Sequence, residues 1–531
     1  AGPHQLRCLA HCRNLRGARC WRAARGQHPL VAAPAAAASG GMAKVSFPCT
    51  DVTGSTEMTE VSSERRGSSV HKVPTCSLGD TLVAVDSEAA LSEPKQQAVQ
   101  YSSLAQTAVN ITKNIVGVGM VTLPRGVKAF SDSPNVAVPA VTLLFLFALA
   151  SAYCFKLIAD VCQRTGESTY QGAWTKTLGR GSLIPALASG ALAFVACVAF
   201  SIATRNASSM ILNVIHTNHL EARGWSKEDF QLFCMLLVAV VVLWPLCMLR
   251  SLASLAKFSA LGVCGSVYIA GFVFLCYLGG EYTEAGAYAA EGGEHGSSEG
   301  NAWATLADPG ICVFLSTLST ALFAHGNAPA FYTQLAPPAD GNKMKSFMMA
   351  SAAGFCLAAA MNALVMVGGF LTFGRRCKGD VLENYSAEDK FAVVAYVFLL
   401  ASVSTSYPLL FYNARRQILG VLDDFVSGAL RARVEDWHQL TTVVLLSLMT
   451  FVAARIPSLG TVACMTGAIL GSFLIYIAPP LMMLAVDCRG GPGPRTSWLE
   501  RACHIALVLL GCVVGTLGVL VELGVVRGRS A

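Results

Sequence analysis

One segment of the sequence places an amide, two glycines and a proline among apolar side chains. It reads Asn114-Ile-Val-Gly117-Val-Gly119-Met-Val-Thr-Leu-Pro124. Inside a helix, Gly costs about 1 kcal/mol and Pro about 3 kcal/mol relative to Ala, and a peptide group left unpaired away from water costs more. Such an interruption is tolerated where it lines a cavity, because its free N–H groups can bind a carboxylate and its free carbonyls a cation. The alternative is close helix packing through small residues.

A second segment is interrupted in the same manner. Phe323-Ala-His325-Gly-Asn-Ala-Pro329 again sets Gly and Pro inside an apolar stretch, and 208 residues separate Gly117 from His325. Paired interruptions in corresponding halves of a chain indicate a binding site between inverted repeats. His325 is the one imidazole well inside this segment. It is either a satisfied core residue or a group that contacts a solute or responds to pH.

A third segment concentrates hydroxyl groups before a proline. Ser402, Ser404, Thr405 and Ser406 fall within five residues, and Pro408 follows them. Oxygen ligands suit a hard cation such as Na⁺, and a proline leaves a backbone carbonyl of its helix without a donor. Alternatively, the hydroxyls bond to carbonyls of their own helix. The sequence leaves both interpretations open.

Long stretches without charge surround these segments. Of the 531 residues, 53% are hydrophobic and only 13% are charged, whereas a soluble domain carries about 25% charge. Between positions 133 and 521, ten stretches of at least 18 residues contain no Asp, Glu, Lys or Arg: 133–155, 181–204, 230–249, 258–280, 309–339, 346–374, 391–414, 437–454, 456–486 and 502–521. A helix of about 20 apolar residues spans a bilayer. Ten of them cannot share one soluble core, so the sequence predicts an all-α polytopic membrane protein.

An eleventh span is expected at 109–130, although only eleven residues separate Lys113 from Arg125. It contains the first interruption, which explains why hydropathy alone passes over it. Together the eleven spans make a predicted membrane domain of residues 101–526.

The first hundred residues differ in composition from this domain. Residues 1–41 contain six Arg before position 26 and no acidic residue. We interpret them as translated upstream sequence before Met42, with a transit peptide as the alternative. Residues 42–100 lack a long apolar periodicity and are expected to form a disordered cytosolic tail.

The charges of the loops predict the orientation. With the N-terminus in the cytosol, the cytosolic loops carry more Lys and Arg than the opposite loops, by a small margin, as membrane insertion favours. The loop at 280–308, which holds five Glu and one Asp but no Lys or Arg, is then non-cytosolic. We expect residence in the plasma membrane or in a vacuolar or lysosomal membrane.

Other function classes lack support in the sequence. There is no P-loop, HExxH, GxSxG or dinucleotide motif, so an enzyme is not expected. The 19 Cys form no CxxC pair and show no zinc-ligand spacing, so we expect no metal site or other cofactor. The net charge of +7 has no basic patch interleaved with aromatics, so a nucleic-acid partner is not expected.

Several motifs, in order along the chain, resemble the amino acid/auxin permease family of the amino acid–polyamine–organocation superfamily. The first interruption resembles its opening Asn-x-x-Gly-x-Gly-x-x-x-Leu-Pro motif. Phe323 to Asn327 resembles its sixth-span motif, where Phe-x-x-Gly-His is commoner and where the His here precedes the Gly. Further similar stretches are Leu249–Ser259, Phe373–Tyr385, Tyr407–Leu409 with Arg415-Arg416, and Pro457–Pro480. Together they cover residues 105–525.

The resemblance implies eleven helices in the leucine-transporter-type arrangement, with spans one to five and six to ten as inverted repeats and one extra helix. It implies a substrate site at the interruptions of spans one and six, with the candidates Gly117, Val118, Gly119, Met120, Phe323, His325, Gly326 and Asn327. In Na⁺-coupled members, span one and the hydroxyls of span eight hold the cation. The comparable residues here are Asn114, Ser404, Thr405 and Ser406.

The expected function is therefore secondary active transport of amino acids by alternating access, coupled to Na⁺ or H⁺, by a monomer in a lipid bilayer. The backbone around Val118–Met120 would bind the α-carboxylate, and Phe323–Asn327 would line the rest of the pocket. The main alternative is an amino acid sensor or adaptor with the same fold and no net transport. An ion channel is a third possibility, but no ring of charged residues supports it.

Overall fold

The computed structural model describes residues 101–527 with short gaps. The gaps are 180–182, 221–225, 250–258, 284–285, 290–292, 294, 297–300, 339–340, 426–436 and 491–495. The predicted tail of residues 1–100, including 1–41, lies outside the described residues, as does part of the acidic loop 280–308. The described part is built from helices, and its one isolated β-bridge joins Ser102 to Leu335.

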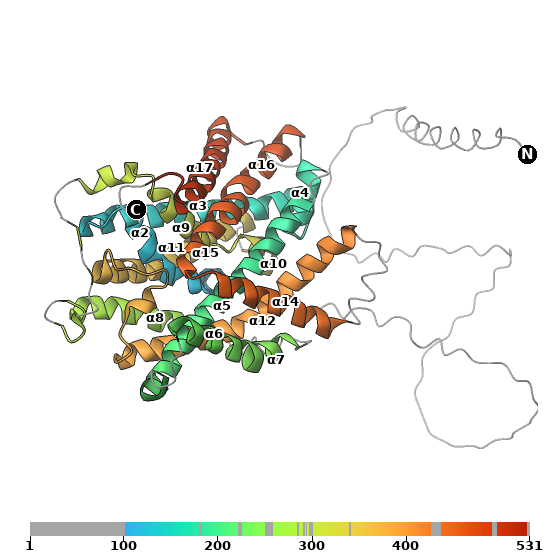
Figure 1. Cartoon of the computed structure of the whole chain (residues 1–531). Helices are drawn as coiled ribbons and strands as arrows, with labels where there is room; N and C mark the ends of the chain where they lie inside the picture. The colour runs from blue at the N-terminus through green and yellow to red at the C-terminus, as the bar shows by residue number, and fades with distance from the viewer. Residues whose placement is uncertain are drawn as a thin grey trace, which may run out of the picture. The chain divides into compact units, whose positions relative to one another are not determined.

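Ten helices of the described part are long and apolar enough to cross a bilayer (Figure 1). They are Pro134–Thr165, Ile184–Val214, Lys227–Cys247, Leu261–Gly279, Ile311–Gln334, Lys343–Phe373, Lys390–Leu419, His438–Arg455, Leu459–Cys488 and Trp498–Glu522. Each coincides with one of the ten charge-free stretches, so the predicted all-α membrane architecture is confirmed.

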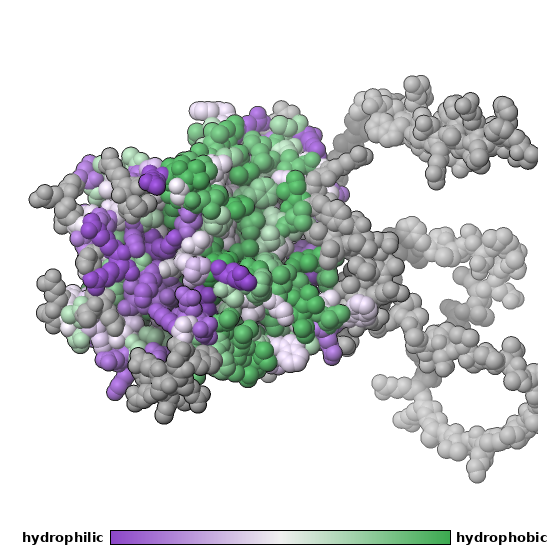
Figure 2. Space-filling model, in the orientation of Figure 1, coloured by the Kyte–Doolittle hydropathy of each residue, from purple (hydrophilic) through white to green (hydrophobic). Residues whose placement is uncertain are grey.

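The surface of these helices is apolar over a large area. Side chains such as Val241, Leu275 and Phe451 are more than half exposed. Figure 2 shows apolar residues over much of the visible helical surface, while hydrophilic residues gather toward its left-hand side. Soluble monomers rarely expose contiguous apolar patches of this extent, whereas lipid tails can cover them.

The segment predicted as the first span is an interrupted helix. α1 (Leu104–Ile115) begins at a capping box formed by Ser103 and Gln106. It ends before Val116 and Gly117, which are both extended. A 3₁₀ turn, η1 (Val118–Thr122), and a short helix, α2 (Leu123–Lys128), follow. Pro124 lies in the first turn of α2, where its missing N–H costs no hydrogen bond.

The second interruption repeats this pattern. α9 (Ile311–Ala321) ends at Leu322, and the chain re-enters helical geometry in the 3₁₀ turn η8 (His325–Asn327). α10 (Ala328–Gln334) then begins with Pro329 in its first turn. In both segments a proline is placed where a new helix starts, rather than within a continuous one.

The remaining helices frame these two segments (Figure 1). They are α3 (Ala137–Thr165), α4 (Tyr170–Leu178), α5 (Leu183–Leu220), α6 (Lys227–Val238), α7 (Trp244–Cys247), α8 (Ser259–Gly279), α11 (Lys343–Phe373), α12 (Lys390–Phe425), α14 (His438–Arg455), α15 (Leu459–Thr466), α16 (Ala478–Cys488) and α17 (Trp498–Glu522). π-Helical stretches join α6 to α7 (η4, Ala239–Leu243) and α15 to α16 (η10, Gly467–Ile477). The 3₁₀ turns η2 (Pro134–Val136), η7 (Ala302–Ala307) and η9 (Val381–Asn384) lie between the long helices.

Buried apolar side chains form two separate cores. The first draws mainly on α1, α2, α3, α9, α11 and α16, and the second on α5, α8, α12 and α14. The first interruption passes between them. Ile115 and Leu123 belong to the first core, Val118 and Val121 belong to the second, and Val116 packs against both. The extended residues of this segment therefore lie where the two packed bodies meet.

Candidate functional site

The two interruptions lie against each other. Asn327 Nδ2 donates a hydrogen bond to Asn114 Oδ1 at 3.1 Å. A Cβ added to Gly119 would lie 2.9 Å from Cα of Ala321, the last residue of α9. Because Cβ atoms essentially never come so close to a backbone atom, this approach requires glycine at position 119. Both interruptions predicted from the sequence are thus present and packed together.

Each interruption carries an unpaired peptide group. Among the described residues, neither Gly117 N–H nor Ala324 N–H has a hydrogen-bond acceptor. Buried N–H groups are nearly always paired in folded proteins. Each of these donors immediately precedes a 3₁₀ turn that leads into a short helix, so the positive end of the helix dipole adds to their electrostatic attraction for an anion. Each donor is therefore available to an anion.

Open space adjoins the two interruptions. A Cβ placed on Gly117 or on Gly326 would meet no atom within 4 Å. The side chains of Asn114 and Asn327 are exposed, although they bond to each other. The two glycines and the two asparagines therefore border a volume that a small solute can enter.

The other predicted substrate residues differ in where their side chains lie. Val118 and Met120 bury their side chains in the second core, so only their backbone can contact a solute. Phe323 is half-buried and packs against the first core. Gly119, as described above, is held against α9. Residues 117–120 can thus offer a solute only their backbone, whereas residues 323–327 can offer both backbone and side chains.

His325 is fully buried beside the second interruption. Its Nε2 lies 3.0 Å from the carbonyl oxygen of Ser151 in α3. Its ring packs edge-to-face against Phe155 and Phe355, each at 5.8 Å between centroids. Nδ1 has no partner among the described residues. This geometry ties the interruption to α3 and α11 through an aromatic core.

The sequence model of one family covers most of this chain. The family is described as "Transmembrane amino acid transporter protein", and it matches residues 100–521. The chain belongs to this family. It is therefore an integral membrane amino acid transporter rather than an enzyme, as the sequence predicted.

Individual relatives are more distant. This transporter is 25% identical over 415 residues to human sodium-coupled neutral amino acid transporter 7, covering 75% of this chain and 83% of that one. It is 22% identical over 423 residues to vacuolar amino acid transporter 2 of Saccharomyces cerevisiae, covering 78% and 82%. Among solved structures it is similar to MhsT in complex with L-phenylalanine, with a TM-score of 0.46 and 15% identity, covering 79% of this chain and 99% of that one.

The predicted cation ligands of the transporter differ in their hydrogen bonding. α12 runs through Pro408 without ending. Thr405 Oγ1 donates to the carbonyls of Ala401 and Ser402 at 2.9 and 3.0 Å, which is the back-bonding alternative. Ser404 is buried and Ser406 is half-buried. The side-chain hydroxyl of neither residue has a hydrogen-bond partner in the described part of the chain. In the same part, no hydrogen bond joins Asn114 to these hydroxyls.

Sequence reasoning missed the packing of α15 and η10 against α9. Thr320 Oγ1 donates to the carbonyl of Ala463 at 2.6 Å. A Cβ on Gly467 would lie 1.7 Å from the carbonyl oxygen of Ser316. The signal was present in the spacing of Gly467 and Gly471, since glycines four residues apart on a helix allow close backbone approach. This contact fixes α9 just before its interruption.

A buried polar group beyond the spans was also missed. Asp380 is fully buried in the segment after α11, and its Oδ1 accepts a hydrogen bond from Leu382 N–H at 3.0 Å. Its Oδ2 has no partner among the described residues. Glu383 accepts a hydrogen bond from Asn206 of α5. Burial, and then the neighbouring charge of Glu383, raises the pKa of Asp380 to about 7.

An apolar groove of about 550 Å³ lies elsewhere, between α6, η4 and α14. Leu236, Val240, Leu446 and Phe451 are among its lining residues, and no residue of either interruption is. Its lining is mostly apolar, with Ser447, Thr450 and Arg455 as the polar exceptions, so it suits the acyl chains of surrounding lipid better than a zwitterion.

Proposed function

We propose that this transporter moves its substrate by alternating access through a site formed at the two interruptions. In this proposal, residues 104–128 are the first of eleven spans, and spans one to five and six to ten are inverted repeats. The observation that carries the proposal is the hydrogen bond between Asn114 and Asn327, beside the unpaired N–H groups of Gly117 and Ala324. Interrupted helices that meet in this way are typical of transporter binding sites.

The site suits the charged groups that all amino acids share. The backbone N–H groups from Gly117 to Gly119 would bind the α-carboxylate. Phe323, Gly326 and Asn327 would line the remainder, with backbone carbonyls accepting the ammonium group. Neither interrupted segment contains an Asp or Glu, so a cationic substrate side chain would find no carboxylate partner there. We therefore propose neutral amino acids as the substrate class, which agrees with the name of the human relative.

His325 would act on this site as a positioning residue. Its Nε2 and ring faces are engaged by Ser151 and by the aromatic core. Through these contacts it would hold the chain between α9 and α10 in its irregular path, so that the Ala324 N–H stays available.

The two cores supply a physical basis for alternating access. Each is packed internally, and the first interruption crosses from one to the other at Val116. Well-packed bodies move as units rather than deform continuously. We propose that they rock about this segment, exposing the site to one side of the membrane and then the other.

Na⁺ is the coupling ion that we favour over H⁺. Asn114 Oδ1 and the hydroxyls of Ser404 and Ser406 are oxygen ligands of the kind that a hard cation prefers. The human relative is named as a sodium-coupled transporter. We further propose that the protein is a monomer with a cytosolic N-terminus. Its membrane would be the plasma membrane or a vacuolar or lysosomal membrane, and the name of the yeast relative favours the vacuolar one.

Uptake into proteoliposomes tests the proposal. Purified full-length protein would be supplied with a panel of radiolabelled amino acids under an inward Na⁺ gradient, an inward H⁺ gradient or neither. We expect saturable uptake of neutral amino acids that an Na⁺ gradient drives. Binding without uptake under every gradient would instead support the sensor, and non-saturable flux with unitary currents would support a channel.

A further inference from the structure

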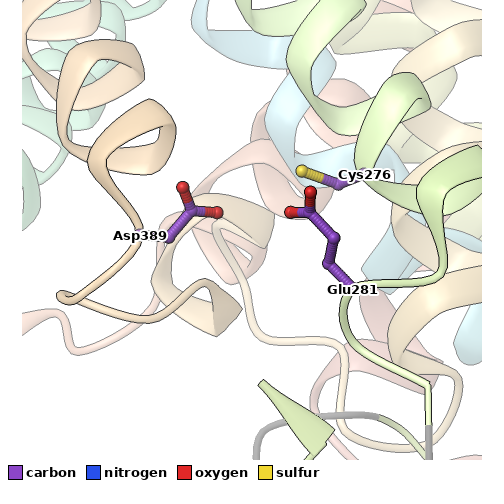
Figure 3. Close-up of side chains that lie close together, drawn as sticks. All are labelled: Cys276, Glu281 and Asp389. Atoms are coloured by element: carbon purple, nitrogen blue, oxygen red, sulfur yellow. The ribbon is translucent and has the colours of Figure 1, made fainter. Parts of the chain in front are cut away.

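A cluster of potential metal ligands lies at the C-terminal end of α8, apart from both interruptions. Cys276 Sγ and one carboxylate oxygen each from Glu281 and Asp389 all lie within 4.8 Å of one another. Figure 3 shows the thiol and the two carboxylates directed into the same gap, the first two from α8 and its following turn and the third from the start of α12. More than 100 residues separate Glu281 from Asp389 in the sequence (389 − 281 = 108).

A tight turn places the first two groups. Gly280 adopts φ of +68°, which glycine tolerates without strain. Its N–H donates to the carbonyl of Cys276 at 3.1 Å and so ends α8. Beyond it, Tyr288 N–H donates to the carbonyl of Glu281 at 2.9 Å and closes the turn. The chain thus reverses and brings Glu281 back over the last turn of α8.

The helix cap of α12 places the third group. Asp389 Oδ1 accepts a hydrogen bond from Phe391 N–H at 2.9 Å, and Oδ2 accepts one from Tyr282 O–H at 3.1 Å. The carboxylate is almost completely buried. Oδ1 also accepts a longer hydrogen bond from Ala392 N–H at 3.4 Å. Each carboxylate oxygen has two acceptor sites, so Oδ2 retains capacity for a further ligand.

The cluster lacks a counterion within the described residues. Neither Glu281 nor Asp389 forms an ion pair there. The side chain of Cys276 is 7% exposed, and its thiol has no hydrogen-bond partner in that part of the chain. Two negatively charged carboxylates this close repel each other. A bound cation would remove that repulsion and also provide the buried sulfur with a partner.

The ligand types select the class of cation. A thiolate with two carboxylates suits Zn²⁺, which binds both sulfur and oxygen, better than Ca²⁺ or Mg²⁺, which bind oxygen alone. Zinc ligands lie about 2.0–2.3 Å from the ion, so the tetrahedral arrangement needs ligand atoms about 3.5 Å apart. Glu281 is exposed and without a side-chain partner in the described part, so rotation of its side chain can shorten its own distances to the other two ligands.

We propose that Cys276, Glu281 and Asp389 form a Zn²⁺-class site that joins α8 to the start of α12, with water as the fourth ligand. On binding, the Cys276 thiol becomes a thiolate and releases its proton to solvent. Both helices belong to the second core, so the ion would stiffen that body rather than block the substrate site. The sequence alone did not indicate this site, because its ligands have no short-range spacing.

Metal binding to the purified full-length protein tests the site directly. Detergent-solubilised protein would be dialysed with Zn²⁺, its metal content measured, and its Tm compared with and without Zn²⁺. We expect wild type to retain about one more equivalent of zinc than Cys276→Ala or Glu281→Gln, and its Tm to rise by about 2 °C or more with Zn²⁺. Co²⁺ should give a thiolate charge-transfer absorption band that Cys276→Ala abolishes.

Matched variants separate this site from adventitious binding. Cys264→Ala alters an exposed thiol of the same helix, and Glu388→Gln alters an exposed carboxylate beside Asp389. Both should bind zinc as wild type does. Equal zinc content and equal Tm shifts in wild type, Cys276→Ala and Glu281→Gln would overturn the proposal. So would a Tm rise that Ca²⁺ reproduces, since Ca²⁺ does not need the thiol.

Discussion

Asn327 Nδ2 lies 3.1 Å from Asn114 Oδ1, and this hydrogen bond joins two helix interruptions that are 213 residues apart in the sequence. Each amide has further donor or acceptor capacity. The pair can therefore hold the two segments in register and still contact a solute or an ion.

Removing either amide should weaken transport, and removing both should add little. A neutral hydrogen bond contributes about 1 kcal/mol, or roughly a fivefold change in an equilibrium constant. We expect Asn114→Ala and Asn327→Ala each to raise KM for uptake several-fold. The double variant should show a coupling of about 1 kcal/mol in a double-mutant cycle. Fully additive effects would mean that the two side chains act independently.

Gly119 should not tolerate even a methyl group. In Gly119→Ala the new Cβ would lie 2.9 Å from backbone Cα of Ala321, so α9 would have to shift. Overpacking of this kind costs about 1–3 kcal/mol. We expect a lower Tm and reduced uptake. Gly271→Ala is the control, because a Cβ there meets nothing within 4 Å; its Tm should match or exceed that of wild type.

His325 should influence transport through structure. In His325→Ala the aromatic core loses a fully buried ring and the hydrogen bond to Ser151, at a cost of about 3 kcal/mol or more. We expect a clear fall in Tm and in the maximal uptake rate, with KM changed by less than about twofold. His325→Gln should recover part of the loss, since its amide can donate to the same carbonyl. A large rise in KM at unchanged Tm would instead indicate direct substrate contact.

Stability should depend on pH through Asp380. Burial raises the pKa of its carboxyl to about 7, whereas the unfolded chain titrates near 4. Between those values the folded state binds the extra proton, so the free energy of unfolding should fall as pH rises from about 4 to about 7 and then level off. We expect the Tm of Asp380→Asn to fall less over this window. The exposed Asp229→Asn should follow wild type, and an unchanged slope in Asp380→Asn would contradict the assignment.

The transmembrane helices could be predicted because lipid imposes a simple compositional rule. No charged residue interrupts ten stretches, and the described structure has a spanning helix at each. The interruptions were also predictable, since Gly117 and Pro124, like Gly326 and Pro329, are unfavourable in a continuous helix. The positions of Gly and Pro in the local sequence predict where the helical hydrogen bonds stop, and the structure has its interruptions at these positions.

The orientation and partners of individual side chains could not be predicted in the same way. Whether His325 faces the solute or the core depends on Ser151 and Phe355, which come from distant helices. The back-bonding of Thr405 is a choice between two local geometries that the same sequence permits. The burial of Asp380 depends on how the segment after α11 folds over α5, which no periodicity reports.

Substrate binding to a variant with a bulky side chain in place of Gly117 tests whether the two interruptions form the substrate site. In Gly117→Leu the new side chain enters space that is empty to 4 Å, and extended backbone at this position accepts any residue. Gly271→Leu is the matched control in α8, where a Cβ also meets nothing within 4 Å. We expect both variants to fold with wild-type Tm, and only Gly117→Leu to lose binding of radiolabelled neutral amino acid and its uptake into proteoliposomes. Wild-type binding and uptake by folded Gly117→Leu would contradict the claim that the substrate lies where the two interruptions meet.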